Sequence, residues 1–124
     1  MATKELTSEN FREFYQNNDM VVLDFWAEWC GPCHAFAPIY EIVSEKFADV
    51  VFGKIDTEAQ QELAAYFAIR GIPTLIIIRQ GIELFRQSGV IPETDLKDII
   101  KNASEVDMAE VIKQIEAEEA QNSD

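Results

Sequence analysis

Two cysteines three positions apart carry the most reactive side chains of this 124-residue chain. Cys30 and Cys33 are separated by Gly31 and Pro32, and the sequence contains no other cysteine. One local pair cannot build a framework of structural disulfides, so the spacing indicates redox chemistry or part of a metal site. Residues at positions i and i+3 lie on the same face of a helix, where the two sulfur atoms can meet.

The surroundings of the pair favour redox chemistry. The apolar run MVVLDFWA (residues 20–27) precedes it and predicts a strand covered on both faces, and a helix is expected from Cys33 to Phe47. The unpaired N–H groups and positive dipole end of a helix N-terminus both stabilise a thiolate, which is the reactive form of cysteine. Pro32 suits a first helical turn because its backbone angle is already helical.

Metal binding and hydrolysis are weaker interpretations of the same residues. A zinc site needs about four ligands, and besides the two cysteines the chain has one histidine, His34. We therefore expect no metal. Consecutive helical residues point about 100° apart, so His34 cannot easily activate either sulfur as a Cys–His hydrolase would require. We interpret His34 as an exposed helix residue whose partial charge can still tune the pair.

Strand and helix signals alternate along the chain and predict an α/β fold with parallel crossovers and an antiparallel edge. Ser8 is a candidate cap for a first short helix with an apolar face of Phe11, Phe14 and Tyr15. Gln80-Gly81 is a two-residue turn signal and predicts a hairpin. The further elements expected are strands at 50–55, 75–79 and 82–88 and helices at 58–67 and 93–101.

Asp24 is the one charged residue in the apolar run that leads to the cysteines. A carboxylate buried in an apolar setting is disfavoured, so its pKa should rise. One interpretation is a core aspartate held by backbone donors; the other is a proton acceptor for Cys33. Lys54 stands alone in the next predicted strand and can offset the charge of Asp24.

Two segments resemble the signature sequences of bacterial thioredoxins, over roughly residues 6–103. The first is DFWAEWCGPC (residues 24–33) and the second is GIPT (residues 71–74). The resemblance implies a thioredoxin fold, a central mixed sheet of four to five strands flanked by helices. It also implies a thiol–disulfide oxidoreductase that reduces disulfides in client proteins and is recharged by a thioredoxin reductase. The resemblance further implies that the Cys30–Cys33 disulfide is the redox-active group and that the protein uses no cofactor.

The resemblance assigns roles to individual residues. Cys30 resembles the attacking thiolate and Cys33 the resolving thiol, and we expect Cys30 to be accessible and Cys33 better buried. Pro73 resembles the cis proline of the family; the alternative is an ordinary loop proline. Asp24 and Lys54 resemble residues that assist catalysis. The groove that takes up an extended substrate segment is predicted to comprise Trp29, Gly31, Pro32, Ile72, Pro73, Gly89 and Val90.

The chain departs from the family pattern at both ends and beside the cysteines. The first strand is represented only by residues 3–6, so that edge is short or absent, and His34 stands where lysine is usual. We expect a thioredoxin domain over residues 1–103 and an acidic helical extension over 104–124 that has no counterpart in a minimal thioredoxin.

The extension is predicted to form a separate helix that docks on its own domain. Its apolar stripe is Met108, Val111, Ile112 and Ile115. A break is expected near residues 102–104, with Ser104 and Asp107 as the capping pair. The alternatives are a solvated acidic tail and a stripe that binds a second copy or a partner.

Charge and composition narrow the setting of the protein. Ten basic and 23 acidic residues give a net charge of −13, which disfavours nucleic acids and anionic membrane surfaces as partners. The N-terminus shows no signal-peptide pattern and the longest apolar run is far too short to span a bilayer. We expect a cytoplasmic monomer. A non-catalytic interaction module and a client-specific reductase steered by the tail remain as alternative functions.

Overall fold

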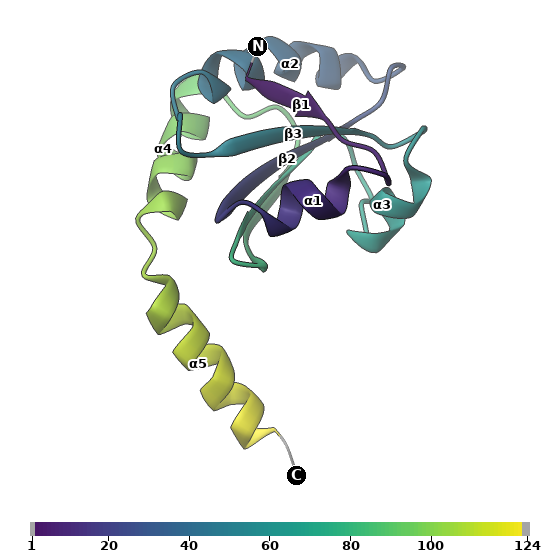
Figure 1. The fold of residues 1–124 in the computed structure, drawn as a ribbon. Coiled ribbons are helices and arrows are strands. Elements are labelled where there is room, and N and C mark those ends of the chain that lie inside the picture. The colour runs from purple at the N-terminus through teal and green to yellow at the C-terminus, as the bar shows by residue number, and fades with distance from the viewer. Residues whose placement is uncertain (1, 123–124) are drawn as a thin grey trace.

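The structure, a computed structural model, describes residues 2–122 and contains a five-stranded mixed sheet with the order β1-β3-β2-β4-β5 (Figure 1). Strand β3 pairs in parallel with both β1 and β2, whereas β4 is antiparallel to β2 and to β5. The strands are β1 (Thr3–Glu5), β2 (Met20–Trp26), β3 (Val51–Asp56), β4 (Thr74–Arg79) and β5 (Ile82–Ser88). The predicted fold class is confirmed, and the first strand is short, as expected.

Helices cover both faces of the sheet. They are α1 (Phe11–Gln16), α2 (Gly31–Ser44), α3 (Gln61–Tyr66), α4 (Glu93–Ser104) and α5 (Met108–Gln121). One core cluster joins α2 and α4 to the sheet face that carries Val22, and the other joins α1 and α3 to the face that carries Val21 and Leu23. Because side chains alternate along a strand, Asp24 lies on the face covered by α2 and α4.

Several helix boundaries differ from the predicted ones for local reasons. Helix α2 begins two residues before Cys33, and α1 begins after Asn10 rather than after a Ser8 cap. The Thr7 N–H donates to Asn10 Oδ1 at 2.7 Å, so Asn10 closes the preceding turn. Helix α3 starts at Gln61 instead of residue 58, because Asp56 Oδ1 accepts the backbone N–H of Glu58 at 2.9 Å and fixes a turn there.

The predicted break before the last helix lies at residues 105–107 rather than 102–104. Helix α4 includes Ser104, and Asp107 is the N-cap of α5, where its carboxylate accepts the Glu110 N–H at 3.2 Å. The proposed capping pair of Ser104 and Asp107 is therefore wrong. The Ser104 hydroxyl instead donates to the Lys101 carbonyl at 2.6 Å within α4.

The expectation that α5 docks along its own domain is also wrong. Figure 1 shows α5 projecting away from the sheet, and Met108 is the one buried residue among those described for this helix. The stripe residues Val111, Ile112 and Ile115 are half-buried. The turn at residues 105–107 directs the helix outward. Residue 1 and residues 123–124, at the ends of the two predicted regions, lie outside the described residues.

Candidate active site

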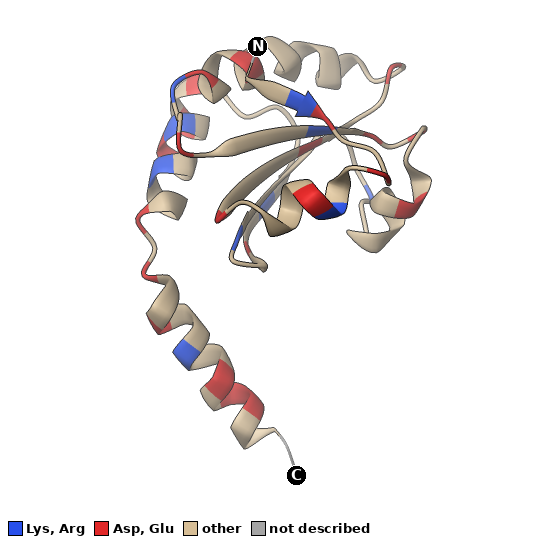
Figure 2. Cartoon of the chain, viewed as in Figure 1, with Lys and Arg blue, Asp and Glu red and all other residues tan. Residues whose placement is uncertain are grey.

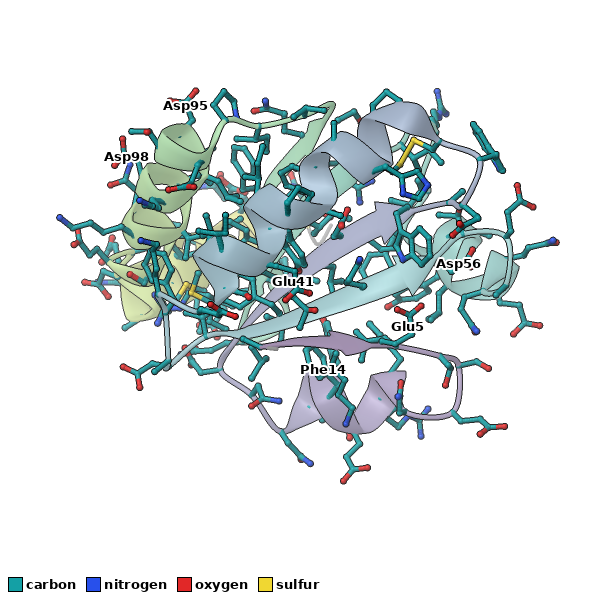
Figure 3. All side chains as sticks on the ribbon, turned by 90° about the horizontal axis from the view of Figure 1, so that it is seen from above. Glu5, Phe14, Glu41, Asp56, Asp95 and Asp98 are labelled. Carbon is teal, nitrogen blue, oxygen red and sulfur yellow. A yellow bond between two sulfur atoms is a disulfide. The ribbon has the colours of Figure 1, made fainter. Side chains whose placement is uncertain are left out.

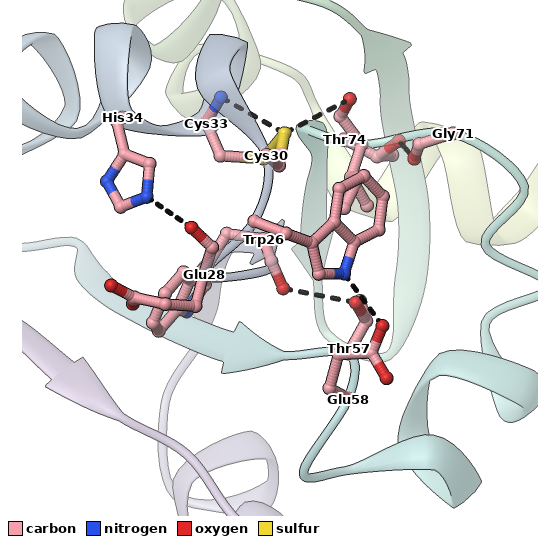
Figure 4. The surroundings of a disulfide bond; sticks show 11 residues. Trp26, Glu28, Cys30, Cys33, His34, Thr57, Glu58, Gly71 and Thr74 are labelled. Carbon is pink, nitrogen blue, oxygen red and sulfur yellow. Dashed lines mark hydrogen bonds between the residues drawn. A yellow bond between two sulfur atoms is a disulfide. The ribbon is translucent and has the colours of Figure 1, made fainter.

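Cys30 and Cys33 lie where strand β2 gives way to helix α2 (Figure 4). Cys30 is the N-cap of α2, Gly31 and Pro32 form its first positions, and Cys33 follows one turn into the helix. The two sulfur atoms form a disulfide, with a Cα–Cα distance of 5.3 Å. The backbone N–H of Cys33 donates to Cys30 Sγ at 3.2 Å. The N-terminal donors of the helix are thus directed at the sulfur predicted to attack, as thiolate stabilisation requires.

Cys30 was predicted to be accessible and Cys33 better buried. That prediction is wrong, because each cysteine exposes 3% of its surface. The loop before β4 covers Cys30: the carbonyl oxygen of Ile72 lies 3.8 Å from Cys30 Sγ. The side chains of Ile72 and Trp26 also pack against the pair. In this oxidised state, the hydrogen bond to Cys30 Sγ distinguishes the two sulfurs, and their exposure does not.

The Ile72–Pro73 loop faces the disulfide and is tied to the end of β5. Its peptide bond is cis, and Pro73 is buried. The Pro73 carbonyl accepts the Gly89 N–H at 2.8 Å, and Gly89 has a φ of +100°, a conformation that favours glycine. The Thr74 and Ser88 hydroxyls meet at 2.8 Å. These bonds bring residues 71–74 and 88–89 together although they are distant in sequence.

The predicted groove residues differ in exposure. Trp29 is 70% exposed, Val90 and the Gly31-Pro32 turn are exposed, and Ile72 is half-buried. The Trp29 indole N–H donates to Glu58 at 2.8 Å, which ties the loop before the cysteines to the β3–α3 turn. Sequence reasoning missed Glu58, because nothing in its local pattern distinguishes it from other surface carboxylates.

Asp24 is buried under helix α2, beside Lys54 in the sheet register. Its exposed fraction is 1%, and its Oδ1 atom has no hydrogen-bond partner in the described part of the chain. The interpretation as a core aspartate held by backbone donors is therefore wrong for this oxygen. Burial raises the pKa of Asp24 to about 7, Lys54 opposes the rise, and Glu5 adds to it. A group that titrates near neutral pH is suited to proton transfer.

Lys54, the partner of Asp24 in the sheet register, also contacts Trp26. Its ammonium nitrogen lies 5.1 Å from the centroid of the Trp26 ring, a cation–π distance. Trp26 in turn packs against the cluster of Ala27, Cys30 and Cys33. The two residues predicted to assist catalysis are thus linked to the disulfide through one tryptophan.

His34 is exposed, as predicted, but it makes a contact that the sequence did not reveal. Its Nε2 atom lies 2.6 Å from the backbone carbonyl oxygen of Glu28 (Figure 4). A carbonyl can only accept, so Nε2 carries the proton in this contact. The histidine thereby joins the first turn of α2 to the loop that precedes Cys30.

Within residues 2–122 no group of three or more His, Cys, Asp or Glu side chains is arranged to hold a metal ion. None of the helices in the same range is long and apolar enough to cross a membrane.

Comparisons with known proteins agree with this geometry. The thioredoxin family model matches residues 2–102. A putative thioredoxin 2 from Streptomyces coelicolor is 51% identical over 97% of this chain and 90% of its own length. A mutant thioredoxin from Halobacterium salinarum aligns with a TM-score of 0.77 at 32% identity, over 84% of this chain and 92% of that one. Fasciola hepatica thioredoxin aligns with a TM-score of 0.73 at 33% identity, over 80% and 97% of the two chains.

Proposed function

The chain belongs to the thioredoxin family and is a thiol–disulfide oxidoreductase, and we propose that it serves as a general reductase of protein disulfides in the cytoplasm. The observation that carries the proposal is the Cys30–Cys33 disulfide at the N-terminus of α2, where the Cys33 N–H donates a hydrogen bond to Cys30 Sγ. That arrangement makes Cys30 the better leaving group and, when reduced, the better-stabilised thiolate.

The proposed cycle moves two electrons from the protein to its client. In the reduced protein the Cys30 thiolate attacks a client disulfide, forms a mixed disulfide and releases one client thiolate. Cys33 then loses its proton and attacks Cys30 Sγ, which closes the Cys30–Cys33 disulfide and releases the second client sulfur. The family implies disulfide-containing substrates and a thioredoxin reductase, which returns two electrons to the pair.

Asp24 and Lys54 are proposed to handle the proton of the second step. Asp24 is buried on the face under α2, and its pKa of about 7 lets it accept the Cys33 proton at neutral pH. Accepting that proton makes Asp24 neutral. Lys54, its neighbour in the sheet register, favours the ionised form and so helps Asp24 to release the proton again. The raised pKa and the unpartnered Oδ1 atom support this role.

The client segment is proposed to bind along the surface beside the disulfide. Trp29 and Val90 offer exposed apolar contacts, and Ile72 offers backbone polar groups next to Cys30. A shallow surface of this kind suits an extended peptide held by main-chain hydrogen bonds. The remaining members of this surface are Gly31, Pro32, Pro73 and Gly89.

We further propose that the protein acts as a monomer and that residues 104–124 form an extension outside the redox site. Figure 1 shows α5 directed away from the end of α2 that carries the cysteines. The projecting helix also supports a second candidate function, a client-specific reductase in which α5 selects the partner. No metal and no cofactor besides the disulfide take part in the proposed cycle.

The assignment of the cysteines is tested by two serine variants assayed on a model protein disulfide with dithiothreitol as the electron source. Cys30→Ser should lose turnover because the attacking sulfur is absent. Cys33→Ser should still attack and should accumulate as a mixed disulfide with the client, visible by mass spectrometry under non-reducing conditions. Near-normal turnover by Cys30→Ser would show that the roles are misassigned.

A further inference from the structure

A row of three charged residues crosses the sheet beneath helix α2. In the strand register Glu5 on β1 is the partner of Lys54 on β3, and Lys54 is the partner of Asp24 on β2. Residues directly opposite one another in neighbouring strands point to the same face of the sheet. The sequence suggests that Lys54 offsets Asp24, but it gives no sign that Glu5 lies beside them, because the short strand β1 is distant along the chain.

Contacts of neighbouring residues show which face carries the row. The Thr3 hydroxyl donates to the carboxylate of Glu41 on α2, so Thr3 faces that helix. Glu5 is two residues further along the same strand and therefore faces α2 as well. Figure 3 shows Glu5, like Asp56 at the end of β3, toward the end of the sheet where α2 begins.

The row contains two carboxylates and one ammonium group. Asp24 is buried, Lys54 is half-buried and Glu5 is exposed, so the row runs from the core to solvent. Within residues 2–122 no ion pair within 4.0 Å joins Lys54 to either carboxylate, and its ammonium group lies over the Trp26 ring instead. Lys54 thus forms a close ion pair with neither carboxylate, although its charge opposes the rise in the pKa of both. The charge of Glu5 acts on the same region as that of Asp24.

We propose that Glu5 is a positioning residue for Asp24, whose negative charge at the solvent end of the row opposes ionisation of Asp24 and keeps it able to store a proton near neutral pH. The inference rests on the proton-accepting role proposed for Asp24 above. Burial is the largest cause of the raised pKa of Asp24, and the charge of Glu5 acts in the same direction while Lys54 acts against both.

Other ionisable groups near Asp24 do not account for the same effect. Tyr40 on α2 donates its hydroxyl to the carbonyls of Val22 and Gly53, and burial raises its pKa well above its ordinary value, so it stays neutral. Glu41 on the same helix accepts the Thr3 hydroxyl, two positions along β1 from the row, and its other carboxylate oxygen has no partner in the described chain. Asp56 accepts backbone N–H groups in its own turn and acts on Glu5, whose pKa burial also raises. Cys30 and Cys33, at the start of α2, are uncharged as a disulfide.

The test is a titration of the Asp24 carboxyl carbon by NMR in the oxidised protein, compared between the parent and Glu5→Gln. Two strand spacings separate Glu5 from Asp24, so removing the charge should lower the Asp24 pKa by about 0.3 to 0.6 pH unit, the interaction of unit charges across roughly 10 Å of partly hydrated protein. Glu5→Asp keeps the charge and should titrate closer to the parent than Glu5→Gln does.

Glu9→Gln is the matched control, because it removes the same charge from an exposed turn outside the row. An unchanged Asp24 pKa in Glu5→Gln, or an equal shift in Glu9→Gln, overturns the proposal. A second readout is the pH midpoint of mixed-disulfide resolution, which should fall with the Asp24 pKa in Glu5→Gln. If the NMR shift is present but Asp24→Asn resolves as the parent does at every pH, the role of Asp24 in catalysis fails while its coupling to Glu5 stands.

Discussion

Asp24, the residue proposed to accept the Cys33 proton, lowers the stability of the protein when it is ionised. It is buried, one of its oxygens has no partner in the described chain, and its pKa is raised from 3.8 to about 7. In the unfolded chain Asp24 has its ordinary pKa of 3.8. Between that pH and about pH 7 the native protein therefore holds a proton that the unfolded chain has lost. The free energy of unfolding therefore falls as pH rises through this interval and stays low above it.

Replacing Asp24 by Asn should stabilise the oxidised protein at pH 8 by roughly 2 to 4 kcal/mol, the cost of ionising a carboxylate whose pKa is raised about three units. At pH 4, where the native carboxyl is protonated, the two proteins should be nearly equal. Chemical denaturation at both pH values measures the difference. Asp49→Asn, at an exposed position, is the control and should change little. A variant less stable than the parent at pH 8 would contradict this account.

Residue types and spacing were enough to single out candidate active residues but not their contacts. The cysteine pair, the isolated charge of Asp24 and Pro73 each stand out in the sequence, and the structure brings the Pro73 loop against the pair. Glu58 and Glu5 could not be found in this way, because their significance depends on a turn and on a strand register that join distant segments.

At the scale of elements, the sheet and its hairpin followed from periodicity, whereas the path of the last helix did not. The guanidinium group of Arg79, at the end of β4, donates to the carbonyls of Ala103, Ser104 and Val106 at 2.8 to 3.2 Å. It also pairs with Asp19 at 3.2 Å. A helix C-terminus leaves carbonyls unsatisfied, and here a strand residue satisfies them and fixes the turn into α5. An arginine that ends an apolar strand gives no sign of this role.

Arg79→Ala should lower the free energy of unfolding by roughly 1 to 3 kcal/mol, because several carbonyls lose a charged donor. It should also increase amide hydrogen exchange in residues 105–121, since the turn before α5 would be released. Arg79→Lys should rescue little, because one ammonium group cannot reproduce the planar set of donors. Arg70→Ala, at an exposed position, is the control. Unchanged exchange in residues 105–121 would show that Arg79 does not hold the turn.

At the scale of the whole molecule, the net charge of −13 is spread over both the domain and its extension. Figure 2 shows acidic residues along the outer half of α5. By sequence, the second half of this helix contains Glu116, Glu118 and Glu119. Charges on a helix that projects from the domain act on an approaching protein before any contact forms. An extension that lies outside the redox site, as proposed above, can therefore still bias which clients are reduced.

The activity of a variant truncated after Asp107 distinguishes a general reductase from a client-specific one. This variant keeps the carbonyls bound by Arg79 and removes α5, which buries Met108 alone among its described residues, so stability should fall by roughly 1 to 3 kcal/mol. A general reductase predicts the same kcat/KM as the full chain on a neutral model disulfide protein. On a disulfide peptide rich in lysine the truncated chain should be slower, and the difference should vanish at high salt.

Met108→Ala in the full chain is the matched control for that truncation. It removes the buried contact of α5 but leaves the acidic helix. It should therefore reproduce most of the loss of stability but should reduce the lysine-rich peptide as fast as the full chain does. If the truncated chain instead lost activity on the neutral protein as well, α5 would take part in client binding, and the client-specific function would be favoured. Equal rates on both substrates would show that the extension does not steer clients electrostatically.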